Sequence, residues 1–378
     1  MPEELAKDLD RFKEFLKDGI EPNLSDWNRN AEIPRSYYPT MGEKGWFGFR
    51  WKNGLLEKLS ALRGAMVQEQ LATLSPGVAV ATLAHVDLGL TGLWLFGSER
   101  IKQAYGEAAV GGETLLCLGN TESSAGSDVA AISTEAREVE GGWMLNGTKA
   151  YVTNGLISDV MIATAVSDPR APRNRRLSMF LVDLKTDGVT RIKLNKQGWI
   201  PSDLTRVELT DVFVPAQHLM GEQGRGLQQV LTIFTYSRVP ITAIALGTAL
   251  GAFEMALGHA RRREIFGRKI VEFQAKEFEM ADLYARMEAA RLMLWKACWA
   301  IDEGRDFRME SSVAKYLAVE IAREVSGWAA DLFGAASIIL DHPVHKFPMD
   351  AWAVSLGEGT QDVQKLVIFR EVMKRYTR

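Results

Sequence analysis

The stretch Thr121-Glu122-Ser123-Ser124-Ala125-Gly126-Ser127-Asp128 (TESSAGSD) marks the point at which the spacing of the hydrophobic residues changes. From Leu55 to about residue 109, apolar residues recur at three- and four-residue steps, which is typical of helices. From about Leu118 to Val214 the period is two, which is typical of strands. The stretch itself is a loop of small residues rich in hydroxyl groups. Such a loop can cradle an anion or a polar ring edge, or it can be an ordinary turn.

The strand region carries clear turn signals. Gly141-Gly142 and Asn146-Gly147 are pairs typical of hairpin turns. The segment from Asp168 to Arg176 is rich in proline and arginine, so we expect an exposed loop there. The strands that we predict are Glu135–Val139, Trp143–Leu145, Val160–Val166, Leu177–Val182 and Val207–Val214.

The helical period returns at about Leu227 and continues to Arg375. Helices, then strands, then helices again indicate an α+β fold rather than a doubly wound parallel sheet. We therefore expect three domains along the chain. They are an N-terminal helical domain at residues 1–116, a middle β domain at 117–226 and a C-terminal helical domain at 227–378.

The composition argues against several classes of protein. The net charge of −3 and the absence of a basic cluster of sufficient size argue against a nucleic-acid footprint. Only two cysteines are present, Cys117 and Cys298, so neither a disulfide framework nor a thiolate zinc site is expected. The charged N-terminus lacks the apolar core of a secretory signal, and we see no apolar run typical of a membrane span. We therefore expect a cytoplasmic protein.

The histidines do not predict a metal site. The nearest approach to a ligand set is Asp341-His342 with His345, but these residues surround Pro343 and lack a partner earlier in the chain. We therefore expect no bound metal.

Glu358 is the residue most suited to acid–base chemistry. It lies in Gly357-Glu358-Gly359-Thr360, and glycine permits a strained backbone and close approach of a ligand. A helix is predicted to follow, with Thr360 as its N-cap and Asp362 in its first turn. An acid on a tight loop at a helix N-terminus is a candidate general base. Taken alone, a solvated loop glutamate is the commoner explanation.

Two further segments each have a functional and a structural interpretation, and for the first the structural one is the commoner. Tyr151 and Thr153 end a strand two residues apart, where they can stack on a flat cofactor and bond to its edge, or form a cross-strand pair. The basic cluster Arg261–Arg268 follows a predicted helix. It can clamp a phosphate, or it can simply complement the helix dipole.

These segments, in this order, resemble motifs of the acyl-CoA dehydrogenase family over nearly the whole chain. The motifs are T-E-x-x-A-G-S-D at Thr121–Asp128, an aromatic-x-T-N-G at Tyr151–Gly155, Lys196-x-Gly198 with Ser202 and Asp211-Val212-x-Val214-Pro215, Arg263-x-x-Phe266-Gly267-x-x-Ile270 with Phe273-Gln274, and E-G-T at Glu358–Thr360. The resemblance implies the family's fold: an N-terminal helical domain, a middle β-sandwich or barrel and a C-terminal four-helix bundle, assembled as a homotetramer.

The resemblance also implies FAD as the cofactor, held without a Rossmann fold. The main chain around Leu118–Thr121 and the Ser127 hydroxyl should hold the flavin ring and pyrophosphate, with Tyr151 against the ring and Thr153 near its N5. The residues expected to reach the FAD of a neighbouring subunit are Arg263, Phe266 and Gln274. Gly334 belongs to the expected pyrophosphate contact, and Thr360 and Asp362 to the adenosine end.

The implied reaction is α,β-dehydrogenation of an acyl-CoA thioester, with an electron-transferring flavoprotein as electron acceptor. Glu358 takes the α-proton, and the β-hydrogen leaves as hydride to the flavin. The family's second possible base position is Ser237 here, so Glu358 has no rival on that helix. Ser127, Arg238 and Gly359 are expected on the substrate side.

Asp87 is unusual in the apolar stretch Ala84–Gly89, where the family lines its acyl pocket. It can be a paired helix acid, or a second acid/base that selects a branched or alicyclic acyl group. In a cyclic enoyl-CoA it could take a γ-proton in a 1,4-elimination. An oxidase or flavin monooxygenase of the same fold is a further alternative, but such branches commonly change the glutamate found here at Glu358.

Overall fold

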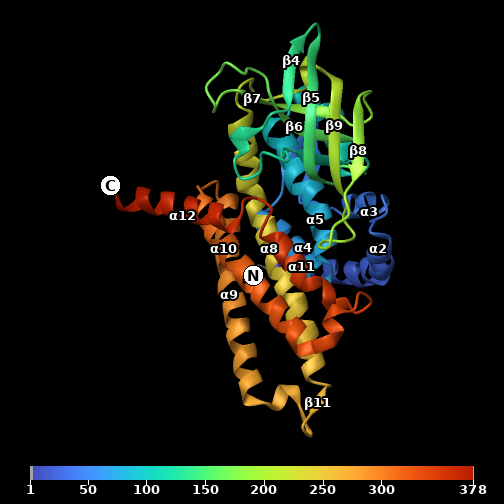
Figure 1. Ribbon diagram of the computed structural model, residues 1–378, viewed down its shortest axis with the longest axis vertical. Helices are drawn as coiled ribbons and strands as arrows, with labels where there is room; N and C mark the ends of the chain where they lie inside the picture. The colour runs from blue at the N-terminus through green and yellow to red at the C-terminus, as the bar shows by residue number, and fades with distance from the viewer. Residues whose placement is uncertain (1–2, 378) are drawn as a thin grey trace.

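A computed structural model describes residues 3–377 and has a β domain at one end and helices below it (Figure 1). This arrangement confirms the α+β prediction and its order of helices, strands and helices. The N-terminal elements are α1 (Glu3–Phe15), η1 (Leu16–Ile20), η2 (Glu21–Asn23), α2 (Leu24–Asn30), α3 (Tyr37–Glu43), β1 (Phe49–Lys52), β2 (Leu55–Lys58), α4 (Ala61–Leu74), α5 (Pro76–Leu83), η3 (Ala84–Leu90), α6 (Thr91–Phe96) and α7 (Glu99–Val110).

The prediction of a helix from Leu55 onward was wrong for its first residues. Leu55–Lys58 is strand β2, which pairs antiparallel with β1 across Asn53-Gly54. Both turn residues have left-handed φ values, 53° and 77°, so this Asn-Gly pair forms a tight hairpin turn and decides the local structure against the apolar spacing. The helix begins only at Ala61, where the Ser60 side chain caps it by accepting from Arg63 N.

The middle domain is one eight-stranded sheet in the order β10-β7-β6-β4-β5-β9-β8, with β3 parallel to β6. Every predicted strand is present. Leu116–Gly119, Val189–Lys193 and Leu219–Met220 were missed because they are short and lack clear alternation. The strands are β3 (Leu116–Gly119), β4 (Glu135–Val139), β5 (Gly142–Thr153), β6 (Val160–Val166), β7 (Leu177–Asp183), β8 (Val189–Lys193), β9 (Leu204–Pro215) and β10 (Leu219–Met220).

The sheet curls around its own core. Trp143 on β5 and Phe180 on β7 come from strands separated by two others, yet their ring centroids lie 5.3 Å apart. Gly141, with φ 79°, makes the predicted turn between β4 and β5. Asn146-Gly147 does not turn the chain. It forms a bulge within β5, where Asn146 exchanges two hydrogen bonds of 2.9 Å with Asp211 of β9.

The C-terminal domain is built on α8, a 35-residue helix that packs against α4 of the N-terminal domain. Gly247 and Gly251 allow this packing, since a Cβ at either would lie 2.2 Å from a main-chain oxygen of α4. Four helices, α8 to α11, pack together, and α12 projects from the body (Figure 1). The elements are α8 (Gly226–Ala260), β11 (Glu264–Ile265), β12 (Arg268–Lys269), α9 (Gln274–Asp302), α10 (Arg308–Phe333), α11 (Lys346–Val354) and α12 (Gln361–Tyr376).

Two helical stretches are long and apolar enough to cross a membrane by length and composition. They are Pro76–Phe96 and Gly226–Ala260, and 78% and 72% of their most apolar windows are buried inside the protein. Burial of this extent is typical of core helices of a globular protein, and α8 occupies that central position.

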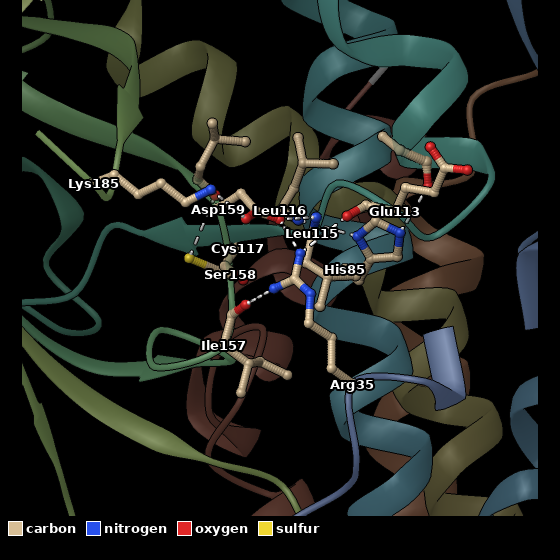
Figure 2. A network of polar contacts seen from close by, with 12 residues as sticks. Arg35, His85, Glu113, Leu115, Leu116, Cys117, Ile157, Ser158, Asp159 and Lys185 are labelled. Atoms are coloured by element: carbon tan, nitrogen blue, oxygen red, sulfur yellow. Dashed lines mark hydrogen bonds and ion pairs between the residues drawn. The ribbon is translucent and has the colours of Figure 1, made fainter. Parts of the chain in front are cut away.

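A polar network joins the N-terminal helices to the β domain (Figure 2). Arg35, which precedes α3, donates to Ile157 O at 2.6 Å and to Glu113 O at 3.0 Å, and it pairs with the Asp159 carboxylate. Asp159 also accepts from Leu115 N at 2.9 Å, at the entrance to β3. The network therefore fixes the point at which the chain passes from helices to strands.

His85 continues this network from within η3, a π-helical turn. Its Nδ1 accepts from Leu116 N at 3.1 Å, and its Nε2 donates to Ala109 O at 3.0 Å. The ring is fully buried, and burial lowers the pKa of His85 to about 4 from the ordinary 6.5. The imidazole is therefore neutral, and it fastens η3 to β3.

We predict that His85 makes the protein sensitive to acid. The unfolded chain binds the proton below about pH 6.5 and the folded chain only near pH 4, so stability falls as the pH falls through this window. His85→Gln keeps a donor and an acceptor but does not titrate. Between pH 7 and pH 4 its free energy of unfolding should drop by about 3 kcal/mol less than that of the wild type. Equal drops in urea denaturation at the two pH values would contradict this role.

Candidate active site

Glu358 lies on the tight loop between α11 and α12, as the sequence predicts. Its φ is 49° and that of Gly359 is 90°, so two successive residues have left-handed backbone conformations. An L-residue rarely adopts this conformation, and it persists only where the surrounding structure enforces it. Thr360 caps α12 by accepting from Val363 N at 3.5 Å, which confirms the predicted N-cap.

Two buried side chains hold this loop in place. Lys315, on α10 and fully buried, donates through Nζ to the carbonyl oxygens of Gly357 and Gly359. Gln364, in the first turns of α12, donates to Glu358 O at 3.1 Å and to Gly359 O at 2.9 Å. Neither residue was predicted from the sequence. A lysine on the buried stripe of a helix was the available signal for Lys315.

The charges around Glu358 give it the properties of a base that works near neutral pH. Burial raises the pKa of Glu358 to about 7, with Asp87 also raising it, against the opposing effects of Lys315 and Arg238. Burial in turn lowers the pKa of Lys315 to about 8 and that of Arg238 to about 10. The carboxyl group therefore sits beside two cations from α10 and α8, and it titrates where a general base is most effective.

A cavity opens between α4, η3 and α8. Its wall is mostly apolar, but Lys58, Gln68 and Asp87 also line it. Gln68 donates to Asp87 Oδ2 at 3.1 Å. Burial raises the pKa of Asp87 to about 6, although Lys58 and Gln68 lower it. The structure thus places the two predicted acids, Glu358 and Asp87, close enough for their charges to interact.

The stretch at residues 121–128 is held by its own glutamate. Glu122 is buried and accepts from the main-chain N and hydroxyl of both Ser133 and Thr134, at 2.5–3.0 Å, and it pairs with Lys149 at 2.7 Å. Burial raises the pKa of Glu122, but Lys149 and these donors outweigh it and lower the pKa to about 2. These contacts, which were not predicted from the sequence, fix the loop to the start of β4 and to β5.

Tyr151 occupies a bulge in β5 close to this loop. The register with β9 jumps from Lys149–Val207 to Val152–Thr205, so Tyr151 has no partner across the sheet and is not part of a cross-strand pair. Its φ is 56° and its side chain is 62% exposed. Ala150 N, its neighbour, donates to Thr121 O at 2.8 Å and ties the loop to the bulge.

The other residues predicted to contact a cofactor fall into two groups. Leu118, Thr121, Ser127 and Thr153 lie with Tyr151 around the loop in the β domain. The Ser127 hydroxyl is exposed and Thr153 is half-buried. A second group lies elsewhere on the helical domain and is exposed to solvent, and its members are Arg263, Phe266, Gln274, Gly334 and Asp362.

The structure does not bring the hairpin residues to the loop within one chain. Phe266 is 95% exposed at the tip of the β11–β12 hairpin, at the opposite end of the molecule from the β domain (Figure 1). No group of three or more His, Cys, Asp or Glu side chains suited to a metal occurs within residues 3–377.

Comparison with known proteins places the chain in a family. Three family models match it: acyl-CoA dehydrogenase N-terminal domain at residues 2–113, middle domain at 117–212 and C-terminal domain at 224–373. A relative from Bacillus subtilis (strain 168), probable acyl-CoA dehydrogenase YngJ, is 31% identical, and the match covers 98% of this chain and 99% of the relative.

Solved structures agree with this result. Butyryl-CoA dehydrogenase from Megasphaera elsdenii superposes with a TM-score of 0.93 at 27% identity, over 99% of both chains. A structure described as the FAD complex of PigA superposes with a TM-score of 0.93 at 25% identity, over 99% of both chains. The family models, the full-length relative and the shared fold together show that this chain belongs to the acyl-CoA dehydrogenase family of oxidoreductases.

Proposed function

We propose that this protein is an FAD-dependent acyl-CoA dehydrogenase in which Glu358 removes the α-proton of a CoA thioester. The main support is the conformation and the raised pKa of Glu358. The residue is held in a left-handed turn, two buried cations act on its carboxyl group, and its pKa is about 7. Acyl-CoA dehydrogenase chemistry needs a base at this pKa, since the α-proton of a thioester is removed at neutral pH.

The residues around the 121–128 loop fit a flavin. The exposed Tyr151 ring offers a flat apolar surface, and Thr153 follows it in the same strand. The hydrogen bond from Ala150 N to Thr121 O brings the loop that carries Ser127 to this bulge, and Leu118 lies in β3 just before that loop. An outward-facing tyrosine in a strained bulge is costly for an isolated protein and is explained by a flat ligand stacked against it. FAD supplies, when bound, the acceptor for the hydride that leaves the β-carbon.

The second group of residues would complete the cofactor site from a neighbouring subunit. We propose that Arg263, Phe266 and Gln274, with Gly334, contact the FAD of a partner chain, while Thr360 and Asp362 lie at the adenosine end. Support comes from the exposed hairpin and from large apolar side chains on α9, α12 and residues 338–340 that a homotetramer would cover. These side chains are Phe278, Leu292, Ile338, Leu340, Phe369 and Tyr376.

In the proposed proton transfer, the ionised Glu358 accepts the α-proton. The charges of Lys315 and Arg238 keep part of the carboxyl population ionised despite its burial. The main-chain N–H of Glu358 is suited to donate to the thioester carbonyl and to stabilise the negative charge that develops on it. Ser127 and Gly359 are proposed to contact the substrate, and the apolar cavity wall excludes water from the acyl group.

We propose that the acyl group is branched or alicyclic. Asp87, with Lys58 and Gln68, puts polar atoms and an ionisable acid in the wall of the cavity. An acid there could act on a ring position beyond the β-carbon, which a straight saturated chain does not need. In a cyclic enoyl-CoA, Asp87 could instead accept a γ-proton while a hydride leaves from the ring, which is a 1,4-elimination. Asp87 has a pKa of about 6, so it is ionised at neutral pH and able to accept a proton.

An oxidase or flavin monooxygenase of this fold is the second candidate. The retained Glu358 favours a dehydrogenase, with an electron-transferring flavoprotein as the proposed acceptor. Rapid reoxidation of the reduced protein by air, compared with reoxidation by electron-transferring flavoprotein, would separate oxidase from dehydrogenase.

A cytoplasmic location and the division of the chain at residues 116/117 and 226/227 stay predictions.

Glu358→Gln should abolish proton removal while leaving the fold and the yellow colour of bound FAD unchanged. The amide has the same shape but cannot accept the proton, so anaerobic loss of flavin absorbance on mixing with acyl-CoA should slow on the order of 10³-fold. Asp350→Asn is a matched control, since Asp350 is also buried with a raised pKa of about 6 but lies outside the site. Rapid flavin reduction in Glu358→Gln would overturn the assignment.

The variant Asp87→Asn tests the proposed preference for a branched or alicyclic acyl group. Wild type should reduce its flavin faster with cyclohexanecarboxyl-CoA or cyclohex-1-enecarboxyl-CoA than with butyryl-CoA or octanoyl-CoA, and the variant should lose this preference. Because the charge of Asp87 raises the pKa of Glu358, the acid limb of kcat/KM should also move to lower pH in the variant. A wild type that prefers the straight chains, with a variant that keeps the same ranking, would leave Asp87 a structural acid.

A further inference from the structure

Lys315 is a buried lysine whose contacts go to the main chain and to no carboxylate. Its side chain is fully buried on α10, and its ammonium donates to the carbonyl oxygens of Gly357 and Gly359, one on each side of Glu358. No salt bridge of Lys315 occurs within residues 3–377. The buried charge is therefore satisfied almost entirely by the two carbonyl groups of the loop.

Burying the Lys315 ammonium group costs free energy, and the cost is explained if the lysine stabilises the conformation of the loop. Moving an ammonium group out of water carries a penalty of several kcal/mol, and methionine at the same position would avoid it. The penalty is visible in Lys315 itself, since burial lowers its pKa to about 8, although the charge of Glu358 opposes this effect. At neutral pH the lysine nevertheless remains mostly protonated, so it provides a fixed positive charge.

We propose that Lys315 is a positioning residue for proton removal: its ammonium group fixes the carbonyls on both sides of Glu358 in the left-handed turn and places a positive charge next to this residue. Its role in catalysis rests on the proposed function of Glu358. Its effect on the geometry and titration of the loop does not.

Three charged groups face Glu358, and they come from three different elements. Lys315 of α10 and Arg238 of α8 lower the pKa of Glu358, and Asp87 of η3 raises it. Of the two cations, Lys315 has the larger effect. Arg238 also differs in kind, because it makes no contact with the loop carbonyls and its Nε has no hydrogen-bond partner within residues 3–377. Of these two cations, only Lys315 both acts on Glu358 through its charge and donates to the carbonyl groups of the loop.

The test is a direct titration of Glu358 in the FAD-loaded protein. Glutamate is labelled with ¹³C at its side-chain carboxyl, and the Glu358 signal is identified by its absence in Glu358→Gln. Its midpoint is then measured in wild type, Lys315→Met and Lys315→Arg. In Lys315→Met the midpoint should rise by about one pH unit or more, because a nearby opposite charge is removed while burial remains. Lys315→Arg keeps the charge and should restore most of the wild-type midpoint.

Lys346→Met is the matched control. Lys346 is another lysine with a pKa lowered by burial, and it donates to one main-chain oxygen, Leu74 O at 2.7 Å, away from the Glu358 loop. Its removal should leave the Glu358 midpoint unchanged. The same four proteins should be compared by the pH dependence of kcat/KM, whose acid limb should move upward with the NMR midpoint only in Lys315→Met.

The outcomes separate the inference from the proposed function. An unchanged Glu358 midpoint in Lys315→Met overturns the inference, and so does an equal rise in Lys346→Met. If Lys315→Met does not fold, a raised midpoint in Lys315→Gln, which keeps a donor without the charge, supports it and an unchanged midpoint overturns it. If none of the acyl-CoA thioesters reduces the flavin of the wild type, the proposed function fails. The titration of the Glu358 carboxyl group still decides the inference about Lys315.

Discussion

The fold of the C-terminal domain is organised around the half-buried Glu358, whose carboxyl group is under the influence of two buried cations, Lys315 and Arg238. A carboxylate removed from water must be paired or it will be protonated. The two cations come from α10 and α8, and the loop comes from between α11 and α12. The helices of the C-terminal domain must therefore pack in one arrangement for the loop to exist in its left-handed form, with Gln364 closing it from the opposite side.

The N-terminal and middle domains position the residues that lie near Glu358 but come from outside the C-terminal domain. Glycines in α8 allow α4 to approach closely, which closes the wall of the cavity that Asp87 lines. His85 fastens η3 to β3, and Asp87 lies two residues further along the same π-helical turn. Such turns are rare in helices and are frequent at functional sites. The network around Arg35 and Asp159 then holds the β domain, with its loop at residues 121–128, against these helices (Figure 2).

The sequence predicts the larger elements well because their patterns are long and unbroken. The α+β order, the major strands, the loop at 168–176 and the N-cap Thr360 are all as expected. The failures are local. Asn53-Gly54 turns the chain where apolar spacing favoured a helix, whereas the same dipeptide at Asn146-Gly147 forms a bulge in which Asn146 pairs with Asp211. Turn signals depend on which strands are available to pair, and this is a tertiary property.

Of the charged residues around Glu358, the sequence singled out the acid Asp87 and the cation Arg238 but not Lys315. Glu358 and Asp87 stand out because they interrupt glycine-rich or apolar stretches. Lys315 and the Glu122–Lys149 pair do not stand out, because a single charged residue in a helix or a strand is normally solvated. Only the structure shows that these lysines are buried and what they hold. The proposed role of Phe266 and the other hairpin residues cannot be judged from one chain, because it requires a second chain.

The central claim is that Glu358 takes the α-proton, and its most direct test isolates that step from oxidation. A 3-thia-acyl-CoA carries sulfur in place of the β-carbon and cannot lose a β-hydride, so exchange of its α-hydrogens with D₂O reports proton removal alone. Wild type should catalyse this exchange with a midpoint near pH 7, as the pKa of Glu358 requires, and Glu358→Gln should not. Exchange that persists in Glu358→Gln, or that is absent from the wild type with bound thioester, would contradict the account.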